Sequence, residues 1–252
     1  IGNGGNVRDL EKRRAIYAEL PSDSLAFNGT NPSFGSWNLI RRFGNDYESP
    51  AIDLTIKRMR KWGLNTIANW SEPRVFDKNE MAFIVPMRDL GMDAQLMSLC
   101  DVYDPDYKKV IDESVSSFVA QFKGNPWLIG YFVSNEPSWI NNETRLCQMI
   151  LNGTGRPIKT ALETYLAKNG DTVPNRRRFI LETFDTFLST VSAALKKYDP
   201  DHLNLGIRFG DPDTLGEDLL EVCKRHFDVF SFNCYQLKPD SAMLDRAAQI
   251  LD

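Results

Sequence analysis

An almost unbroken apolar run, Trp127 to Val133, lies in the middle of the chain between two prolines. It consists of aliphatic and aromatic residues with one glycine, which is typical of a strand buried on both faces, as in a parallel sheet. The polar residues Ser134, Asn135 and Glu136 follow directly at its carboxyl end. In an α/β barrel this end of the strands holds the functional residues. We therefore predict a buried parallel strand with a candidate site at its end.

Glu136 is the candidate catalytic group of this stretch. Because it adjoins an apolar strand, we expect its surroundings to raise its pKa into the range useful to a general acid. The alternative is an ordinary carboxylate on a solvated loop, and a single Asn-Glu pair does not decide between the two.

Composition excludes several classes of protein. With 252 residues, of which 42 % are hydrophobic and 25 % charged, the chain has the size of one (β/α)8 barrel. Its net charge of −4 argues against a nucleic-acid partner, and no apolar stretch is long enough to span a membrane. With no C-x-x-C pair and 2 histidines, we expect neither a metal site nor a cofactor.

From residue 51 onward, helical and strand patterns alternate regularly. Gly63 and Gly91 end two of the helices, and Asp104-Pro105 begins another. No hairpin signal separates the strands, so we predict a parallel sheet with right-handed crossovers. The predicted helices cover residues 51–62, 79–90, 104–123, 158–168, 177–198, 214–226 and 241–251, and the predicted strands cover residues 64–70, 92–99, 127–133, 202–209 and 227–233.

Two regions depart from this alternation. Residues 1–50 show no clear period, apart from a helical patch over 7–20 and a short strand candidate over 25–27. Residues 140–178 interrupt the pattern after the central strand, and we predict an inserted loop there, on the same face as Glu136. The whole of 1–252 is predicted to be a single domain.

Polar residues follow every predicted strand. Because the carboxyl ends of parallel strands meet at one edge, this placement predicts one shared site and favours the catalytic interpretation of Glu136. A closed barrel needs eight strands and the pattern shows fewer, so we predict an α/β fold that is an incomplete (β/α)8 TIM barrel, as a fragment or the ordered part of a longer protein. The strand-end residues are Asn69-Trp70-Ser71, Asp101, Asn135-Glu136, Arg208-Phe209-Gly210-Asp211 and Asn233-Cys234-Tyr235.

Four segments at these strand ends resemble glycoside hydrolase clan A, the TIM-barrel retaining glycosidases. Their order along the chain also matches, over roughly residues 35 to 250. Within the clan the sequence is most similar to the β-agarases of family 50, with the β-galactosidases of family 42 as cousins. The segments are Gly63-Leu-Asn-Thr-Ile-Ala-Asn-Trp-Ser, Asp101-Val-Tyr-Asp-Pro, Pro126-Trp-Leu-Ile-Gly-Tyr-Phe-Val-Ser-Asn-Glu and Phe227-Asp-Val-Phe-Ser-Phe-Asn-Cys-Tyr.

The resemblance implies roles for several residues. It makes the central strand the fourth of the barrel, so that strands two to six are visible and strands one, seven and eight are missing. Glu136 would then be the general acid/base, Asn135 would bind the substrate hydroxyl next to the anomeric carbon, and Tyr235 would lie beside the nucleophile. The clan's nucleophile is a Glu at the end of strand seven, which is expected beyond Asp252.

Other strand-end residues keep two interpretations. Trp70 and Trp139 suit stacking on sugar rings or packing at the rim, with neither favoured. Arg208 would contact a substrate hydroxyl or pair with Asp211, and the ion pair is slightly favoured. Asn69 is expected to converge with Glu136. Asp101 and Asp104, also at strand ends, are expected to be helix caps and loop anchors rather than catalysts.

Three functions compete. The first is a retaining glycoside hydrolase that cleaves β-galactosidic linkages in a polysaccharide or oligosaccharide such as agarose. The second is a non-catalytic carbohydrate-binding or scaffold fragment of such a barrel, and for the chain as given we expect no hydrolysis. A metal-dependent hydrolase is disfavoured because His202 and His226 lie away from the predicted strand ends.

The expected partners follow from the first function. They are a carbohydrate substrate and barrel strands supplied by a longer or a second polypeptide, with no nucleic acid and no membrane. The expected location is secreted or periplasmic. The chain begins with Ile1 and shows no signal peptide, so its natural N-terminus is expected to be missing.

Overall fold

The computed structural model describes residues 27–28, 31–88, 90–210 and 215–251. The chain falls into two compact units, one of residues 1–66 with 71–81 and one of residues 67–70 with 82–252. Each unit is described by itself. The helix predicted over 7–20 lies outside the described residues, as does Asp211.

The first unit is mainly helical. Two ion pairs join its longest helix, α3 (Glu48–Lys61), to residues 71–81 of the same unit. They are Lys78–Asp53 at 2.6 Å and Arg60–Glu80 at 2.9 Å. That helix confirms the prediction over 51–62, and Gly63, with a φ of 76°, ends it as expected. The elements are β1 (Phe27–Asn28), antiparallel to β2 (Asn31–Pro32), α2 (Phe34–Phe43), α3 (Glu48–Lys61) and the 3-10 helix η3 (Pro73–Lys78).

The second unit is built on parallel strands that are neighbours in chain order. The β4–β7, β7–β9, β8–β10 and β10–β11 pairs are all parallel. Backbone hydrogen bonds from Leu205 to Tyr131 and from Val133 to Gly206, 2.9 and 2.8 Å long, continue the pairing between β7–β9 and β8–β10. The parallel arrangement was predicted and is confirmed. The strands are β3 (Thr66–Ile67), β4 (Ala82–Pro86), β7 (Leu128–Phe132), β8 (Ser134–Asn135), β9 (Leu203–Asn204), β10 (Ile207–Phe209) and β11 (Ser231–Phe232).

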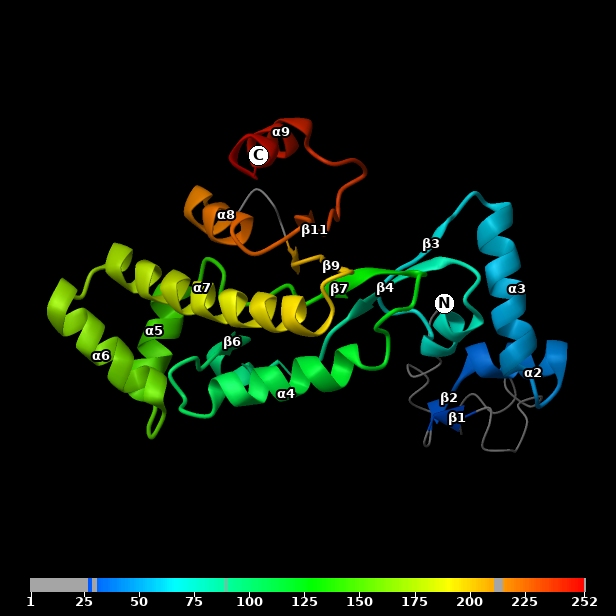
Figure 1. The fold of residues 1–252 in the computed structure, drawn as a ribbon, viewed down its shortest axis with the longest axis horizontal. Helices are drawn as coiled ribbons and strands as arrows, with labels where there is room; N and C mark the ends of the chain where they lie inside the picture. Colours follow the sequence, from blue (N-terminus) through cyan, green and yellow to red (C-terminus); the bar gives the residue numbers. More distant parts are fainter. Residues whose placement is uncertain (1–26, 29–30, 89, 211–214, 252) are drawn as a thin grey trace, which may run out of the picture. The chain divides into compact units, whose positions relative to one another are not determined.

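Helices cover this sheet. The ring of Phe118 in α4 packs on Tyr131 of β7, and the neighbouring Phe122 packs on Phe83 of β4, with centroids 6.3 and 6.2 Å apart. The long helix α7 runs beside α4 (Figure 1). No helix in the described part of the chain is both long and apolar enough to cross a membrane. The helices are α4 (Tyr107–Val119), α5 (Glu143–Asn152), α6 (Pro157–Asn169), α7 (Val173–Tyr198), α8 (Glu217–Lys224) and α9 (Ser241–Leu251).

The helix predicted over 79–90 is wrong, because this segment contains β4. Its buried side chains, Met81, Phe83, Val85 and Met87, alternate with less buried ones, which is the period of a strand and not of a helix. The strand predicted over 92–99 is wrong as well. Short strands β5 (Met92–Asp93) and β6 (Leu99–Cys100) pair there in antiparallel fashion around the 3-10 helix η4 (Ala94–Leu96).

The inserted loop predicted over 140–178 is mostly helical. It contains α5 and α6, and only the second of these matches a predicted helix. The next helix, α7, begins at Val173 rather than at Arg177, because Pro174 occupies its first turn, where a proline is tolerated. Thr172 caps it by accepting a hydrogen bond from the backbone of Asn175 at 3.3 Å.

Arg177 ties this helical insertion to α8. Its guanidinium donates two hydrogen bonds of 2.7 Å to the Asp218 carboxylate, and a third to Glu143 at the start of α5. The Glu143 side chain is 8 % exposed, so it is a nearly buried charge, and within the described residues its ion pair is with Arg177. The arrangement makes Arg177 a charged link between α5, α7 and α8.

Replacing Arg177 with Met is expected to lower the free energy of unfolding by about 2 kcal/mol, because it leaves the Glu143 carboxylate buried without a partner. The value lies below that for a fully buried pair because Asp218 is half exposed. The measurement is urea denaturation, with Lys109→Met as the control, since Lys109 pairs with Glu113 on the open surface. Equal denaturation midpoints for the two variants would contradict this role of Arg177.

Candidate active site

The carboxyl ends of β8, β10 and β11 bring Glu136, Arg208 and Tyr235 together. Arg208 lies opposite Asn135 in the β8–β10 register, and the backbone N–H of Glu136 donates to the carbonyl of Arg208 at 2.8 Å. Glu136 itself has a φ of 44°, a left-handed conformation that is uncommon for a non-glycine residue. The strand ends therefore hold Glu136 in one fixed direction.

Four side chains form what we call the Glu136 cluster: Glu136, Arg208, Asn233 and Tyr235. The Tyr235 hydroxyl and the Asn233 carboxamide both donate to the same oxygen, Oε1, of Glu136. The Asn233 Oδ1 accepts from the Arg208 guanidinium at 2.7 Å, so the amide has a defined orientation. The cluster is thus a carboxylate held by two neutral donors, with a cation behind them.

These donors set the charge state of Glu136. The hydrogen bond from Tyr235 has the largest effect, followed by that from Asn233, and together with the charge of Arg208 they hold the pKa of Glu136 below its usual value. The prediction of a raised pKa is therefore wrong for this chain. Glu136 is only half-buried, so the opposing effect of burial is smaller than that of its partners.

Tyr235→Phe is expected to raise the pKa of Glu136 toward the ordinary value of a glutamate, because it removes the largest cause of the lowering. Tyr235 is 79 % exposed, so the fold should not change. The measurement is a carbon-13 NMR titration of the Glu136 carboxyl group. Tyr198→Phe is the matched control: it removes a 2.6 Å hydrogen bond to Asp112 and should raise that pKa alone. An unchanged or lower Glu136 pKa in Tyr235→Phe would contradict the assignment.

Of the two interpretations left open for Trp139, the structure favours packing over sugar stacking. Its side chain is 1 % exposed and packs edge to face on Phe184 of α7, with ring centroids 4.8 Å apart. Trp70, in contrast, is 64 % exposed and has a φ of 68° at the end of β3. Of these two tryptophans, Trp70 is the one whose indole is in contact with solvent.

Asn69 and Asn135 lie at the ends of β3 and β8. Asn135 is exposed. Both polar atoms of the Asn69 carboxamide are buried and have no hydrogen-bond partner among the described residues, a state that normally costs free energy unless a ligand or water completes it. Neither Asn69 nor Trp70 makes a described hydrogen bond to the Glu136 cluster, so their convergence with Glu136 stays a prediction.

Asn233 is the site residue that the sequence analysis placed at a strand end without giving it a role. It stands two positions before Tyr235 at the same strand end, and its backbone N–H donates to Phe209 at 2.7 Å. Both residues follow β11, and the Asn233 carboxamide donates to the Tyr235 hydroxyl at 3.3 Å, so their shared position at one strand end was the available signal. Within the described residues, no group of three or more His, Cys, Asp and Glu side chains could hold a metal ion.

The histidines have structural partners. His202 lies between the Asp199 carboxylate, 2.8 Å from its Nδ1, and the carbonyl of Asn125, 3.0 Å from its Nε2. Tyr131 donates to the same Asp199 at 2.6 Å. Asn125 precedes β7, and Asp199 and His202 precede β9, at the end of these strands opposite to Glu136.

Comparison with known proteins gives a consistent result. No family model matches the chain. β-Agarase B of Vibrio sp. (strain JT0107) is 26 % identical to this chain. The alignment is 291 positions long, and it covers 89 % of this chain and 30 % of that protein. In the structure of the agarase AgWH50C, 94 % of this chain superposes on 41 % of that one, with a TM-score of 0.76 and 26 % identity. The chain resembles the β-agarases of glycoside hydrolase family 50.

Further relatives of this β-agarase-like chain agree. β-Agarase A of the same organism is also 26 % identical, over 89 % of this chain and 29 % of that protein. The structure of PfGH50B shares the fold with a TM-score of 0.74 and 22 % identity, covering 95 % of this chain and 44 % of that one. The resemblance predicted from the strand-end motifs is confirmed. The chain spans less than a third of the length of these curated relatives.

Proposed function

We propose that the chain carries the acid/base half of a retaining glycoside hydrolase that cleaves β-galactosidic linkages in agarose or a similar polysaccharide. The observation that carries the proposal is the Glu136 cluster, a carboxylate held by side chains from neighbouring parallel strands at their carboxyl ends. The similarity to proteins named β-agarases supports the choice of substrate.

The fold in this proposal is part of one (β/α)8 barrel. Neighbouring strands follow chain order and run parallel, as barrel strands do. The observed strands are two to six, and strands one, seven and eight come from the rest of a longer chain or from a second polypeptide. The α5–α6 pair is an insertion into the single catalytic domain.

The mechanism is a double displacement. Glu136 donates a proton to the leaving oxygen while a nucleophilic carboxylate, expected beyond Asp252, attacks the anomeric carbon. In this class the two carboxyl groups are about 5–5.5 Å apart, so the negative charge of the nucleophile raises the pKa of Glu136 against the effect of Tyr235 and Asn233. Glu136 is then protonated when the first step begins.

The lowering of the Glu136 pKa by its neighbours serves the second step. Once the nucleophile has formed the glycosyl ester, its charge is gone, and Tyr235, Asn233 and Arg208 again favour the ionised form of Glu136. The ionised carboxylate then removes a proton from the attacking water. One cluster thus supports both the acid and the base role.

The remaining strand-end residues bind the sugar in this proposal. The exposed Asn135 carboxamide holds the hydroxyl next to the anomeric carbon, the Asn69 carboxamide gains its missing partners from the substrate, and Trp70 stacks on a ring. Arg208 acts through Asn233.

A gel-forming polysaccharide is too large to enter a cell, which fits a secreted or periplasmic enzyme.

The test is an activity screen of the full-length protein on agarose, agaro-oligosaccharides and aryl β-galactosides. Release of reducing ends from agarose, with the β configuration in the first product, is the expected result. Binding of agarose without any cleavage would favour the non-catalytic alternative, and cleavage with inversion would contradict the double displacement.

A further inference from the structure

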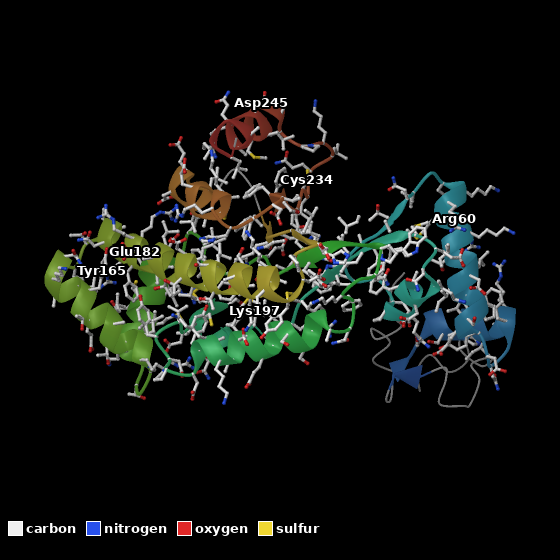
Figure 2. The ribbon with its side chains drawn as sticks, in the orientation of Figure 1. Arg60, Tyr165, Glu182, Lys197, Cys234 and Asp245 are labelled. Carbon is white, nitrogen blue, oxygen red and sulfur yellow. The ribbon has the colours of Figure 1, made fainter. Side chains whose placement is uncertain are left out.

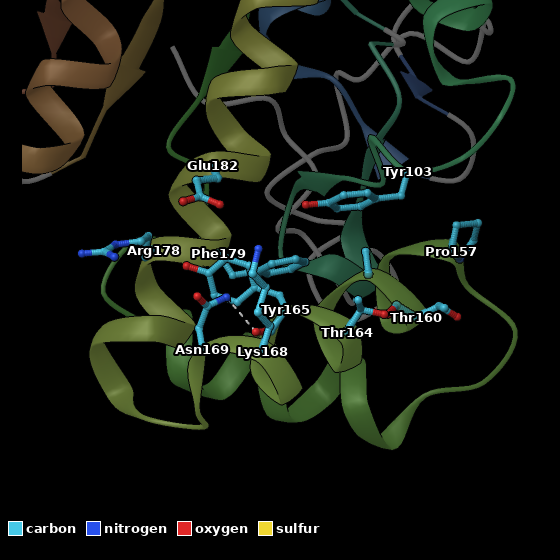
Figure 3. Close-up of a pocket in the computed structure, with 11 residues that line it drawn as sticks. Tyr103, Pro157, Thr160, Thr164, Tyr165, Lys168, Asn169, Arg178, Phe179 and Glu182 are labelled. Atoms are coloured by element: carbon cyan, nitrogen blue, oxygen red, sulfur yellow. Dashed lines mark hydrogen bonds between the residues drawn. The ribbon is translucent and has the colours of Figure 1, made fainter.

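A groove between α6 and α7, away from the Glu136 cluster, has the features of a second binding site. Its volume is about 840 Å3, within the range of small-molecule sites. Tyr103, which follows β6, closes one side (Figure 3). We call it the α6–α7 groove, and its main lining residues are Tyr103, Thr164, Tyr165, Lys168, Phe179 and Glu182.

Aromatic rings form its floor. Tyr103 stacks nearly parallel to Phe179, with centroids 5.6 Å apart and planes 7° apart, and Tyr165 tilts against Phe179 at 5.4 Å. The Tyr103 hydroxyl bonds to Thr183 at 3.1 Å, and Thr183 in turn donates to the carbonyl of Phe179. Tyr103 therefore holds its orientation although it is 38 % exposed, and a fixed platform binds with less loss of entropy.

Uncharged groups and both signs of charge surround this floor. One face of α6 presents Thr160 and Thr164 at helical spacing, while its other face is buried through Ile158, Leu162 and Leu166. Lys168 and Arg178 are balanced in part by Glu182, and Figure 2 shows Tyr165 and Glu182 at the same end of the unit.

This composition selects the ligand. Because the rim carries charges of both signs, with an excess of one positive charge, it gives no strong preference for an anion or a cation. Aromatic faces bind the C–H faces of a sugar ring, and hydroxyl and charged groups around them can bond to its hydroxyls. A neutral saccharide matches both features at once.

We propose that the α6–α7 groove is an auxiliary saccharide-binding site that holds a second stretch of the polysaccharide while another lies at the Glu136 cluster. The identity of the saccharide rests on the proposed function. When the polymer leaves one of the two sites, a contact at the other keeps it close, so that it binds again quickly. The protein is therefore retained longer on the polymer, although the Glu136 cluster is unchanged. The site would also explain the presence of α6, a helix that the strand–helix alternation of a (β/α)8 barrel does not require.

The test uses the full-length protein with Thr164→Arg, which places a large side chain in the groove. Thr164 is exposed, and its hydroxyl bonds only to the carbonyl of Thr160, so the substitution should leave the fold intact. Thr186→Arg on α7 is the control, because Thr186 is also exposed, makes the same bond to Glu182 and lies outside the groove lining. Retention on agarose beads is measured in a Glu136→Gln background, and turnover of a short soluble agaro-oligosaccharide is measured with Glu136 present.

Thr164→Arg is expected to weaken binding to agarose by about fivefold, in line with the loss of one stacking platform, and to leave kcat/KM on the short oligosaccharide unchanged. Equal retention for the two arginine variants would overturn the proposal. So would a lower melting temperature of Thr164→Arg alone, which would mean that another part of the protein fills the groove. If Thr164→Arg weakens binding but the parent protein cleaves nothing, the proposal for the α6–α7 groove is supported and the proposed function is contradicted.

Discussion

Glu136→Gln is expected to reduce cleavage of agarose by about 10²- to 10⁴-fold, the usual contribution of a positioned general acid. Glutamine keeps the shape and can still accept from Tyr235, but it has no proton to give to a sugar leaving group. An aryl galactoside with a good leaving group needs little acid assistance, so its first step should be nearly unaffected. The measurement is kcat/KM on both substrates in the full-length protein.

The comparison between substrates separates this role from a structural one. Glu113→Gln, on the exposed face of α4, is the control and should change neither value. An equal, mild loss on both substrates in Glu136→Gln would argue for a binding or positioning role instead.

Gly130→Ala is expected to destabilise the second unit by more than about 3 kcal/mol, a loss of the size seen when the core must move. A Cβ at this position would lie 2.9 Å from the carbonyl carbon of Leu203 and still closer to its oxygen, both in the backbone of the paired strand β9. Backbone atoms cannot turn away as a side chain does, so the β7–β9 pairing must open. The measurement is the denaturation midpoint of the variant.

Gly35→Ala serves as its control. Gly35 lies in α2, and an added Cβ would meet nothing within 4 Å, so alanine should be neutral or slightly stabilising there. If Gly130→Ala denatured at the same concentration as the parent protein, the close approach of β7 and β9 would be wrong.

Much of the fold could be predicted where a local signal and burial agreed. Gly63 ends α3 as expected, and the apolar run up to Val133 is a buried parallel strand followed by the site. The prediction for the β4 segment was wrong because apolar residues at 81, 83, 84, 85 and 87 fit both the helix period and the strand period over so short a stretch. The pairing with β7, which decides between them, is a long-range contact.

The site was predictable only in part for the same reason. The position of Glu136 follows from the sequence, but its pKa depends on donors that follow β11, almost a hundred residues later in the chain. Trp139 stands next to the site in sequence, yet α7 covers it, and nothing local indicates that packing. Asn233 acquires its role only from Glu136 and Arg208, which lie at the end of β8 and in β10.

Rescue by azide tests the role of Glu136 most directly. In full-length Glu136→Ala, an aryl β-galactoside with a good leaving group should still form the glycosyl-enzyme, which then accumulates because no base activates water. Azide is already ionised and needs no base, so it should attack the anomeric carbon and restore turnover. Two inversions give a galactosyl azide of β configuration, which is the predicted product. A product of α configuration would make Glu136 the nucleophile, and no rescue at all would contradict its place in the reaction.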